Sequence, residues 1–114
     1  MSILTVSPRG GNADFASFVR GVMNPAQVFG STYENGLATL ASLGPHWTAV
    51  VVTEDPGGVE SSMFIQALTS RFPSQGKKII LNSDDGRDEK VGGVIVLSHF
   101  NFADKLKVHL RRLD

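Results

Sequence analysis

A glycine-rich segment with a positive charge follows the first apolar run of the chain. Residues 7–12 read Ser-Pro-Arg-Gly-Gly-Asn, and Asn12 is of a type that often caps the start of a helix. Backbone N–H groups and the helix dipole make such a place receptive to phosphate. The spacing matches neither of the common glycine-rich nucleotide motifs. Two interpretations stay open: a ligand loop formed by Arg9, Gly10, Gly11 and Asn12, or a tight turn with a solvated arginine.

Acidic residues follow two later apolar runs. Glu54 and Asp55 come after the third run, and Asp84 and Asp85 come after the fourth. Carboxylates gathered at one edge of a sheet could hold a divalent cation. Acidic loop residues are more often simply solvated, so we expect no metal site.

The histidines and serines do not have the spacing of a known catalytic or metal site. His46, His99 and His109 lack the close spacing of a metal-binding pair, and no Gly-x-Ser-x-Gly motif is present. At the mouth of the fifth strand His99 could bind a ligand or titrate near neutral pH, although a structural role is the simpler interpretation. We expect no enzyme, no catalytic residue and no cofactor.

The chain has 114 residues, enough for one domain (residues 1–114) with its own core. Lys and Arg number 11, as do Asp and Glu, so zero net charge gives no broad attraction to nucleic acid or an acidic membrane. The absence of cysteine excludes disulfides, thiolate metal sites and cysteine nucleophiles. The aliphatic runs fall far short of the roughly 20 residues of a membrane helix, and no secretory signal is visible. We expect a cytoplasmic protein with no direct nucleic-acid or membrane partner.

Apolar periodicity predicts strands that alternate with helices. Short aliphatic or β-branched runs predict strands at residues 3–6, 26–29, 49–52, 78–81 and 94–97. Apolar residues at helical spacing predict four helices, beginning near Phe15, Leu37, Phe64 and Phe102. The apolar face of the first helix holds Phe15, Phe18, Val19 and Val22. Ser31 or Thr32 would cap the second helix.

Strands alternating with helices imply parallel β-α-β units and a sheet covered on both faces. The runs at 49–52 and 94–97 lack polar alternation, as expected for strands buried on both faces. We predict an α/β fold of the small doubly wound, flavodoxin-like type, with a five-stranded parallel sheet in the order 2-1-3-4-5. In such folds ligands bind outside the carboxyl ends of the strands.

The segment after the fourth strand does not support a helix. Residues 84–91 contain a single apolar side chain, Val91, so a helix here would have no face to bury. We predict a loop or a single turn over residues 84–90, and the fourth helix of the doubly wound fold is therefore shortened or missing.

Two parts of the chain resemble the receiver domains of bacterial response regulators. Residues 92–100 (Gly-Gly-Val-Ile-Val-Leu-Ser-His-Phe), with a helix ending Leu-Arg-Arg-Leu at 110–113, are similar to the family's last strand and last helix. Residues 50–68 are similar to its third strand, turn and third helix, with Gly-Val-Glu at 58–60 in the place of its Gly, apolar residue and Glu. The resemblance follows the element order of the whole chain and implies a receiver-like fold.

The residues that carry the family's phosphorylation chemistry are replaced. The resemblance places Ser7 at the acidic pair, Thr53 at the phosphoacceptor and Ser98 at the lysine, and only Ser83 keeps the family's type. Magnesium needs carboxylate oxygens, and a hydroxyl is a weaker acceptor than a carboxylate. Asp55 would need a displaced cation cluster to accept phosphate in place of Thr53. The resemblance therefore implies a degenerate receiver, or pseudo-receiver.

The function implied by this resemblance is two-component signalling through protein–protein contacts, without phosphorylation. The implied partners are a histidine kinase, a phosphotransfer protein of a phosphorelay, or another signalling domain, with a homodimer as a further option. The residues expected on the partner surface are Phe18, Val22, Met23, Ile95 and His99. Met23, Tyr33 and Trp47 are further candidates for exposure.

The alternative function belongs to another class. A small α/β protein could bind a phosphate-bearing ligand or nucleotide at the carboxyl ends of the strands, using Arg9 and residues 53–58. Fold alone does not decide between the two functions. Loss of binding on removal of Arg9 would favour the ligand.

Overall fold

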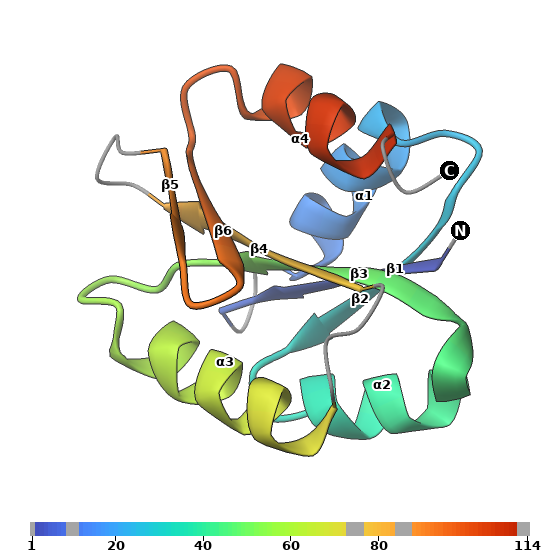
Figure 1. Cartoon of the computed structure of the whole chain (residues 1–114). Coiled ribbons are helices and arrows are strands. Elements are labelled where there is room, and N and C mark those ends of the chain that lie inside the picture. Colours follow the sequence, from blue (N-terminus) through green and yellow to red (C-terminus); the bar gives the residue numbers. More distant parts are fainter. Residues whose placement is uncertain (1, 9–11, 73–76, 84–87, 112–114) are drawn as a thin grey trace.

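The computed structural model describes residues 2–8, 12–72, 77–83 and 88–111, which form an α/β fold (Figure 1). The strands are β1 (Ser2–Ser7), β2 (Gln27–Thr32), β3 (Trp47–Thr53), β4 (Lys78–Ser83), β5 (Glu89–Val91) and β6 (Val94–Ser98). The helices are α1 (Asn12–Val22), α2 (Gly36–Leu43), α3 (Val59–Arg71) and α4 (Phe102–Arg111), with a short 3-10 helix η1 (Gly44–His46). The predicted alternation of strands and helices is confirmed.

The strands form one sheet in the order β2-β1-β3-β4-β6-β5. All neighbouring strands are parallel except β5, which runs antiparallel to β6. The prediction of five strands in the order 2-1-3-4-5 is therefore wrong, because a sixth strand is added beside the last parallel one. The five parallel strands have the predicted order relative to one another.

The added strand arises from a glycine turn. Gly92 and Gly93 have φ values of 55° and 87°, and two consecutive residues with positive φ suit the tight turn of a β-hairpin. The turn places Val91 opposite Val94 and Lys90 opposite Ile95. Residues 89 and 90 belong to the segment 84–90, which was predicted to be a loop or a single turn because a helix there would have no apolar face to bury. An edge strand does not need one, since β6 supplies its hydrogen-bond partners.

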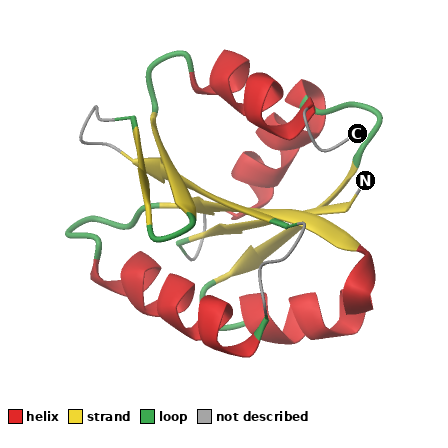
Figure 2. Ribbon diagram, viewed as in Figure 1, coloured by secondary structure: helices red, strands yellow, loops and turns green. Residues whose placement is uncertain are grey.

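Helices cover both faces of the sheet (Figure 2). Helices α1 and α4 pack on one face, and α2 and α3 pack on the other, each over its own group of buried side chains. Strand β3 contributes to both groups: Ala49 and Val51 face α1 and α4, whereas Val50 and Val52 face α2 and α3. All four side chains are fully buried. The aliphatic run at 49–52 thus behaves as predicted for a parallel strand buried on both faces.

Two candidates for exposure, Met23 and Trp47, are buried. Met23 is 8% exposed and belongs to the core under α1, because it follows Val19 by one helical turn. Trp47 is 3% exposed; its ring packs edge-on against Phe72, which follows α3. Phe18, expected both on the apolar face of the first helix and on the partner surface, is 44% exposed. The buried stripe of α1 runs through Ala16, Val19 and Met23.

The start of α2 also differs from the prediction. Ser31 and Thr32 were expected to cap this helix, but both belong to β2. The helix begins at Gly36, after Asn35, whose side chain makes no capping hydrogen bond. Register with β1 holds Ser31 and Thr32 in the sheet, opposite Val6 and Ser7. In the part of the chain that the structure describes, no helix is long and apolar enough to cross a membrane.

Candidate functional site

Every parallel strand of the sheet ends on a hydroxyl-bearing residue. These residues are Ser7, Thr32, Thr53, Ser83 and Ser98, and together we call them the hydroxyl edge. The parallel register aligns their strand ends, because Ser7 lies opposite Thr32 and Ser83 lies opposite Ser98. Ser7, Ser83 and Ser98 are each at most 3% exposed. The structure thus brings together the four hydroxyl positions that the receiver resemblance singled out.

Three buried side-chain atoms at this edge have no hydrogen-bond partner among the described residues. They are Ser7 Oγ, Thr53 Oγ1 and Asn82 Oδ1. Asn82 is the register partner of Thr53. A buried polar group without a partner costs about 1–3 kcal/mol, so these atoms have hydrogen-bonding capacity left for a ligand.

The carboxylate of Asp55 hydrogen-bonds to the start of α3. It accepts hydrogen bonds from the backbone N–H groups of Glu60 (3.1 Å) and Ser61 (2.8 Å), in the first turn of α3. These N–H groups have no partner within the helix. Burial alone raises the pKa of Asp55, but the hydrogen bonds from Ser61 and Glu60 outweigh it and bring the pKa below its ordinary value. The carboxylate is therefore ionised and committed to α3.

Glu54, the residue before Asp55, turns toward β4 instead. Its backbone N–H donates to the carbonyl of Asn82 (3.0 Å), which extends the β3–β4 ladder by one residue. Its carboxylate accepts a long hydrogen bond of 3.4 Å from the Ser83 hydroxyl. Adjacent carboxylates thus point to different elements and do not form a pair that could chelate a cation.

A lysine from α4 reaches the edge. Lys105 Nζ lies 3.1 Å from Ser98 Oγ and 2.9 Å from Asp88 Oδ1, and Asp88 also accepts a hydrogen bond from the Ser98 N–H at 2.8 Å. The Ser98 N–H and Lys105 together hold the pKa of the Asp88 carboxyl below its usual range. A positive charge therefore stands beside Ser98, supplied by a helix rather than by the strand end.

The position of Lys105 in its helix is a sequence signal for this contact. Lys105 lies in the first turn of α4, where the helix dipole disfavours a positive charge. A lysine at such a position indicates a partner elsewhere, which here consists of Asp88 and Ser98.

Most of the remaining predicted ligand residues lie outside the described part of the chain. Arg9, Gly10 and Gly11 lie outside the described residues, as do Asp84 and Asp85, while Asn12 begins α1 as expected. The possible cation cluster of Glu54 and Asp55 with Asp84 and Asp85 therefore stays a prediction, because two of its four members lie outside the described residues. Among the described residues no group of three or more His, Asp or Glu side chains is placed to hold a metal ion.

The predicted partner surface is only partly exposed. Phe18 rests on two aromatic neighbours, with ring centroids 6.3 Å from Phe15 and 6.2 Å from Phe102. His99 is exposed and its ring lies 4.2 Å from that of Phe100, which is itself 64% exposed. Val22 and Ile95 are half-buried against the core, and Met23 is buried within it. We call Phe18 with its supports Phe15 and Phe102 the aromatic surface.

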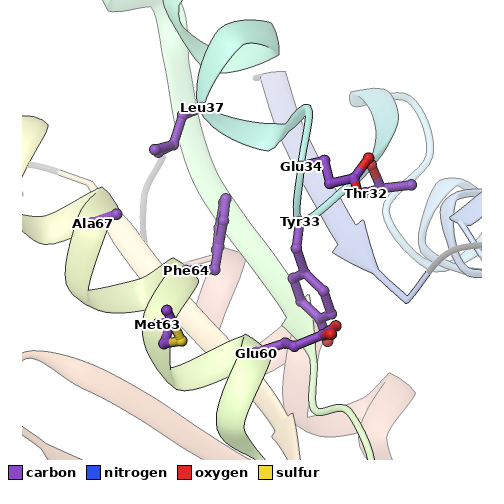
Figure 3. A pocket seen from close by; sticks show the side chains of 8 residues that line it. All are labelled: Thr32, Tyr33, Glu34, Leu37, Glu60, Met63, Phe64 and Ala67. Atoms are coloured by element: carbon purple, nitrogen blue, oxygen red, sulfur yellow. The ribbon is translucent and has the colours of Figure 1, made fainter.

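A pocket between α2 and α3 was not predicted (Figure 3). Its volume is about 460 Å³, and it is lined by Thr32, Tyr33, Glu34, Leu37, Glu60, Met63, Phe64 and Ala67. We call it the α2–α3 pocket. The signal that could have found it is a second apolar pair on α3, Val59 and Met63, which lies outside the buried stripe of Phe64 and Leu68.

Comparisons with protein-family models, with curated proteins and with solved structures find no match to this chain. The resemblance to receiver domains stays a prediction. The features that bear on function are therefore the hydroxyl edge, the Asp55 contact with α3, the aromatic surface and the α2–α3 pocket.

Proposed function

We propose that this chain is a receiver-like signalling domain that acts through protein–protein contacts and without phosphorylation. The observation that carries the proposal is the position of Asp55, the aspartate closest in sequence to the acceptor position Thr53. Its two oxygens accept hydrogen bonds from the N–H groups of Glu60 and Ser61, so phosphorylation of either oxygen would disturb the contact with the first turn of α3. The other strand ends offer hydroxyls where the family's chemistry needs an acidic pair.

The flavodoxin-like, doubly wound arrangement belongs to the same proposal. Five parallel strands with two helices on each face support it, as does the relative order of those strands. Strand β5 lies in the chain segment where the family has its fourth helix. A dimer of the family's usual type would therefore meet a different surface.

The aromatic surface supports a protein partner. Phe18 is 44% exposed and is held in place by Phe15 and Phe102. A pre-positioned aromatic side chain contributes strongly to interfaces, because little conformational freedom is lost when the partner binds. The partners that fit the proposal are a histidine kinase, a phosphotransfer protein or another signalling domain.

Amide NMR spectra recorded during titration with Mg²⁺, followed by beryllofluoride as a mimic of a phosphoryl group, test the phosphorylation-independent part. We expect no saturable shift at Thr53, Asp55, Ser83 or Ser98, because the described carboxylates do not form a cation site. A receiver domain with an intact acidic pair serves as the positive control. Saturable shifts confined to these residues would overturn the proposal.

Binding to a panel of purified histidine-kinase dimerisation domains and phosphotransfer domains tests the contact part. We expect a binder whose affinity is the same with and without acetyl phosphate. Phe18→Ser should lower that affinity about tenfold or more, whereas Val108→Ser, at an exposed apolar residue of α4, should not. A panel without any binder, or binding that needs acetyl phosphate, would contradict the proposal.

The alternative is a phosphate-bearing ligand at the hydroxyl edge. The observation that favours it is the unused hydrogen-bonding capacity of Ser7 and Thr53 among the described residues. Inorganic phosphate and ADP, titrated in the same NMR experiment, should then shift the amides of both residues, and Arg9→Ala should abolish the shifts. Unchanged spectra would exclude this alternative.

A further inference from the structure

The α2–α3 pocket combines an apolar floor with an acidic rim. Its volume of about 460 Å³ lies within the range of roughly 300–1,000 Å³ typical of ligand pockets. Phe64, Leu37 and Ala67 form the floor, and Figure 3 shows Glu34 in the segment between β2 and α2 and Glu60 on α3. Both charged residues of the lining are carboxylates, and both are exposed.

Tyr33 fixes one wall of the pocket. Its ring lies 6.1 Å from the ring of Phe64, and its hydroxyl donates to the backbone carbonyl of Thr53. Burial raises the pKa of Tyr33, and the negative charges of Asp55 and Glu60 raise it further. The tyrosine is therefore neutral, and the field at this end of the pocket is negative.

The apolar surface continues past the pocket along α3. Val59 and Met63 are each 64% exposed, and residues four apart lie on the same face of a helix. A small molecule held in the pocket would leave Val59 uncovered. An apolar strip that joins a pocket fits a length of polypeptide better than a compact ligand.

We propose that the α2–α3 pocket docks a basic segment of a partner protein, which inserts one bulky apolar side chain over Phe64 and sets Lys or Arg against Glu34 and Glu60. Charge complementarity selects this partner chemistry: the rim offers carboxylates, so an acidic segment would be repelled. The pocket and the aromatic surface lie on opposite faces of the sheet. The proposal for either surface can therefore be wrong while the other is right.

An amidated peptide with one Trp flanked by Lys on both sides is the probe. Amide NMR titration should give saturable shifts at Glu34, Leu37, Glu60 and Met63. Peptides with Glu in place of Lys, or Ala in place of Trp, should give none at the same concentrations. Shifts scattered over the surface, or equal shifts with the Glu peptide, would overturn the proposal.

Charge-reversal variants test the rim. Glu34→Lys combined with Glu60→Lys should weaken peptide binding about tenfold or more, since two attractive contacts become repulsive. Glu89→Lys makes the same charge change at an exposed residue of β5, and should weaken binding no more than twofold. Equal losses from both changes would show a general effect of net charge and contradict docking at this pocket.

Filling the pocket tests its floor. Ala67→Leu adds apolar volume to a lining residue and should abolish the Trp-dependent part of the binding, while Phe18→Ser should leave it unchanged. Tryptamine, a cationic indole without a peptide chain, separates the two kinds of occupant. If tryptamine binds as tightly as the peptide, the occupant is a small molecule and the proposed partner segment is wrong.

Discussion

The contacts of a single carboxylate, that of Asp55, limit the chemistry available at the end of β3. It accepts two backbone hydrogen bonds from the first turn of α3 while 8% exposed. Asp55→Ala should destabilise the fold by about 1 kcal/mol at neutral pH, the usual effect of losing a helix cap. Urea denaturation measures this change.

The effect of Asp55→Ala should depend on pH. The folded-state pKa of Asp55 lies below the ordinary value of 3.8, so its stabilisation is present above that value and is lost as the pH falls through the folded-state pKa. The difference between wild type and variant should therefore shrink in acid. Asp104→Ala, at an exposed first-turn carboxylate of α4, is the control. A difference that stays constant into acid would refute the role given to Asp55.

Lys105 makes a second prediction at the scale of single residues. Lys105→Met removes one of the groups that lower the pKa of Asp88, and leaves the Ser98 N–H and His109. The Asp88 pKa should therefore move part of the way back toward its ordinary value. Carboxyl ¹³C NMR during a pH titration follows it directly. An unchanged Asp88 midpoint would mean that the ion pair is absent in solution.

The sequence predicted which residues lie at the hydroxyl edge, but it did not predict the contacts that Asp55 and Lys105 make. Ser7, Thr53, Ser83 and Ser98 could be placed together because parallel strands end at one edge. The direction of Asp55 depends on the turn at Pro56, Gly57 and Gly58, where two glycines have φ values of 86° and 73°. Local pattern does not fix where such a turn puts the start of α3. Whether Lys105 contacts Asp88 and Ser98 depends in the same way on how α4 packs on the sheet.

At the scale of elements, the packing of α2 on α3 depends on one glycine. A Cβ at Gly36 would lie 2.6 Å from Cε2 of Phe64, closer than atoms can approach. Gly36→Ala should destabilise the fold by about 1–2 kcal/mol, because the forced shift of the Phe64 ring outweighs the gain in helix propensity. Chemical denaturation measures the change.

Gly21 provides the matched control. It lies in α1, where an added Cβ would meet no atom within 4 Å. Gly21→Ala should therefore stabilise the protein by about 0.5–1 kcal/mol. The two identical exchanges are expected to have opposite signs. If Gly36→Ala also stabilises, the close contact between α2 and Phe64 does not exist in solution.

Strands with a continuous apolar run were predicted from the sequence, whereas the three-residue strand β5 was not. Residues 49–52 and 94–97 have continuous aliphatic runs, and their strands were placed correctly. Strand β5 has three residues, all exposed, so no burial pattern marks it. Only the two glycines that follow it signal the hairpin, and the same dipeptide also suits an ordinary loop.

At the scale of the whole molecule, the sheet separates two cores that share no side chain among the described residues. The aromatic surface lies over one and the α2–α3 pocket lies over the other. A partner bound to one face can influence the other only through the buried strands between them. Close packing makes such strands stiff, so we expect little coupling between the two faces.

A double-mutant cycle across the sheet tests this separation. Val19→Ala in α1 should cost about 2 kcal/mol and Leu68→Val in α3 about 1 kcal/mol, from the buried methyl and methylene groups lost. Both side chains are fully buried, on opposite faces of the sheet. Because they have no shared neighbours in the two cores, the double variant should show the sum of the single effects to within about 0.5 kcal/mol in urea denaturation. A coupling above about 1 kcal/mol would mean that the sheet transmits packing changes, and the two surfaces would then have to be treated as one linked system.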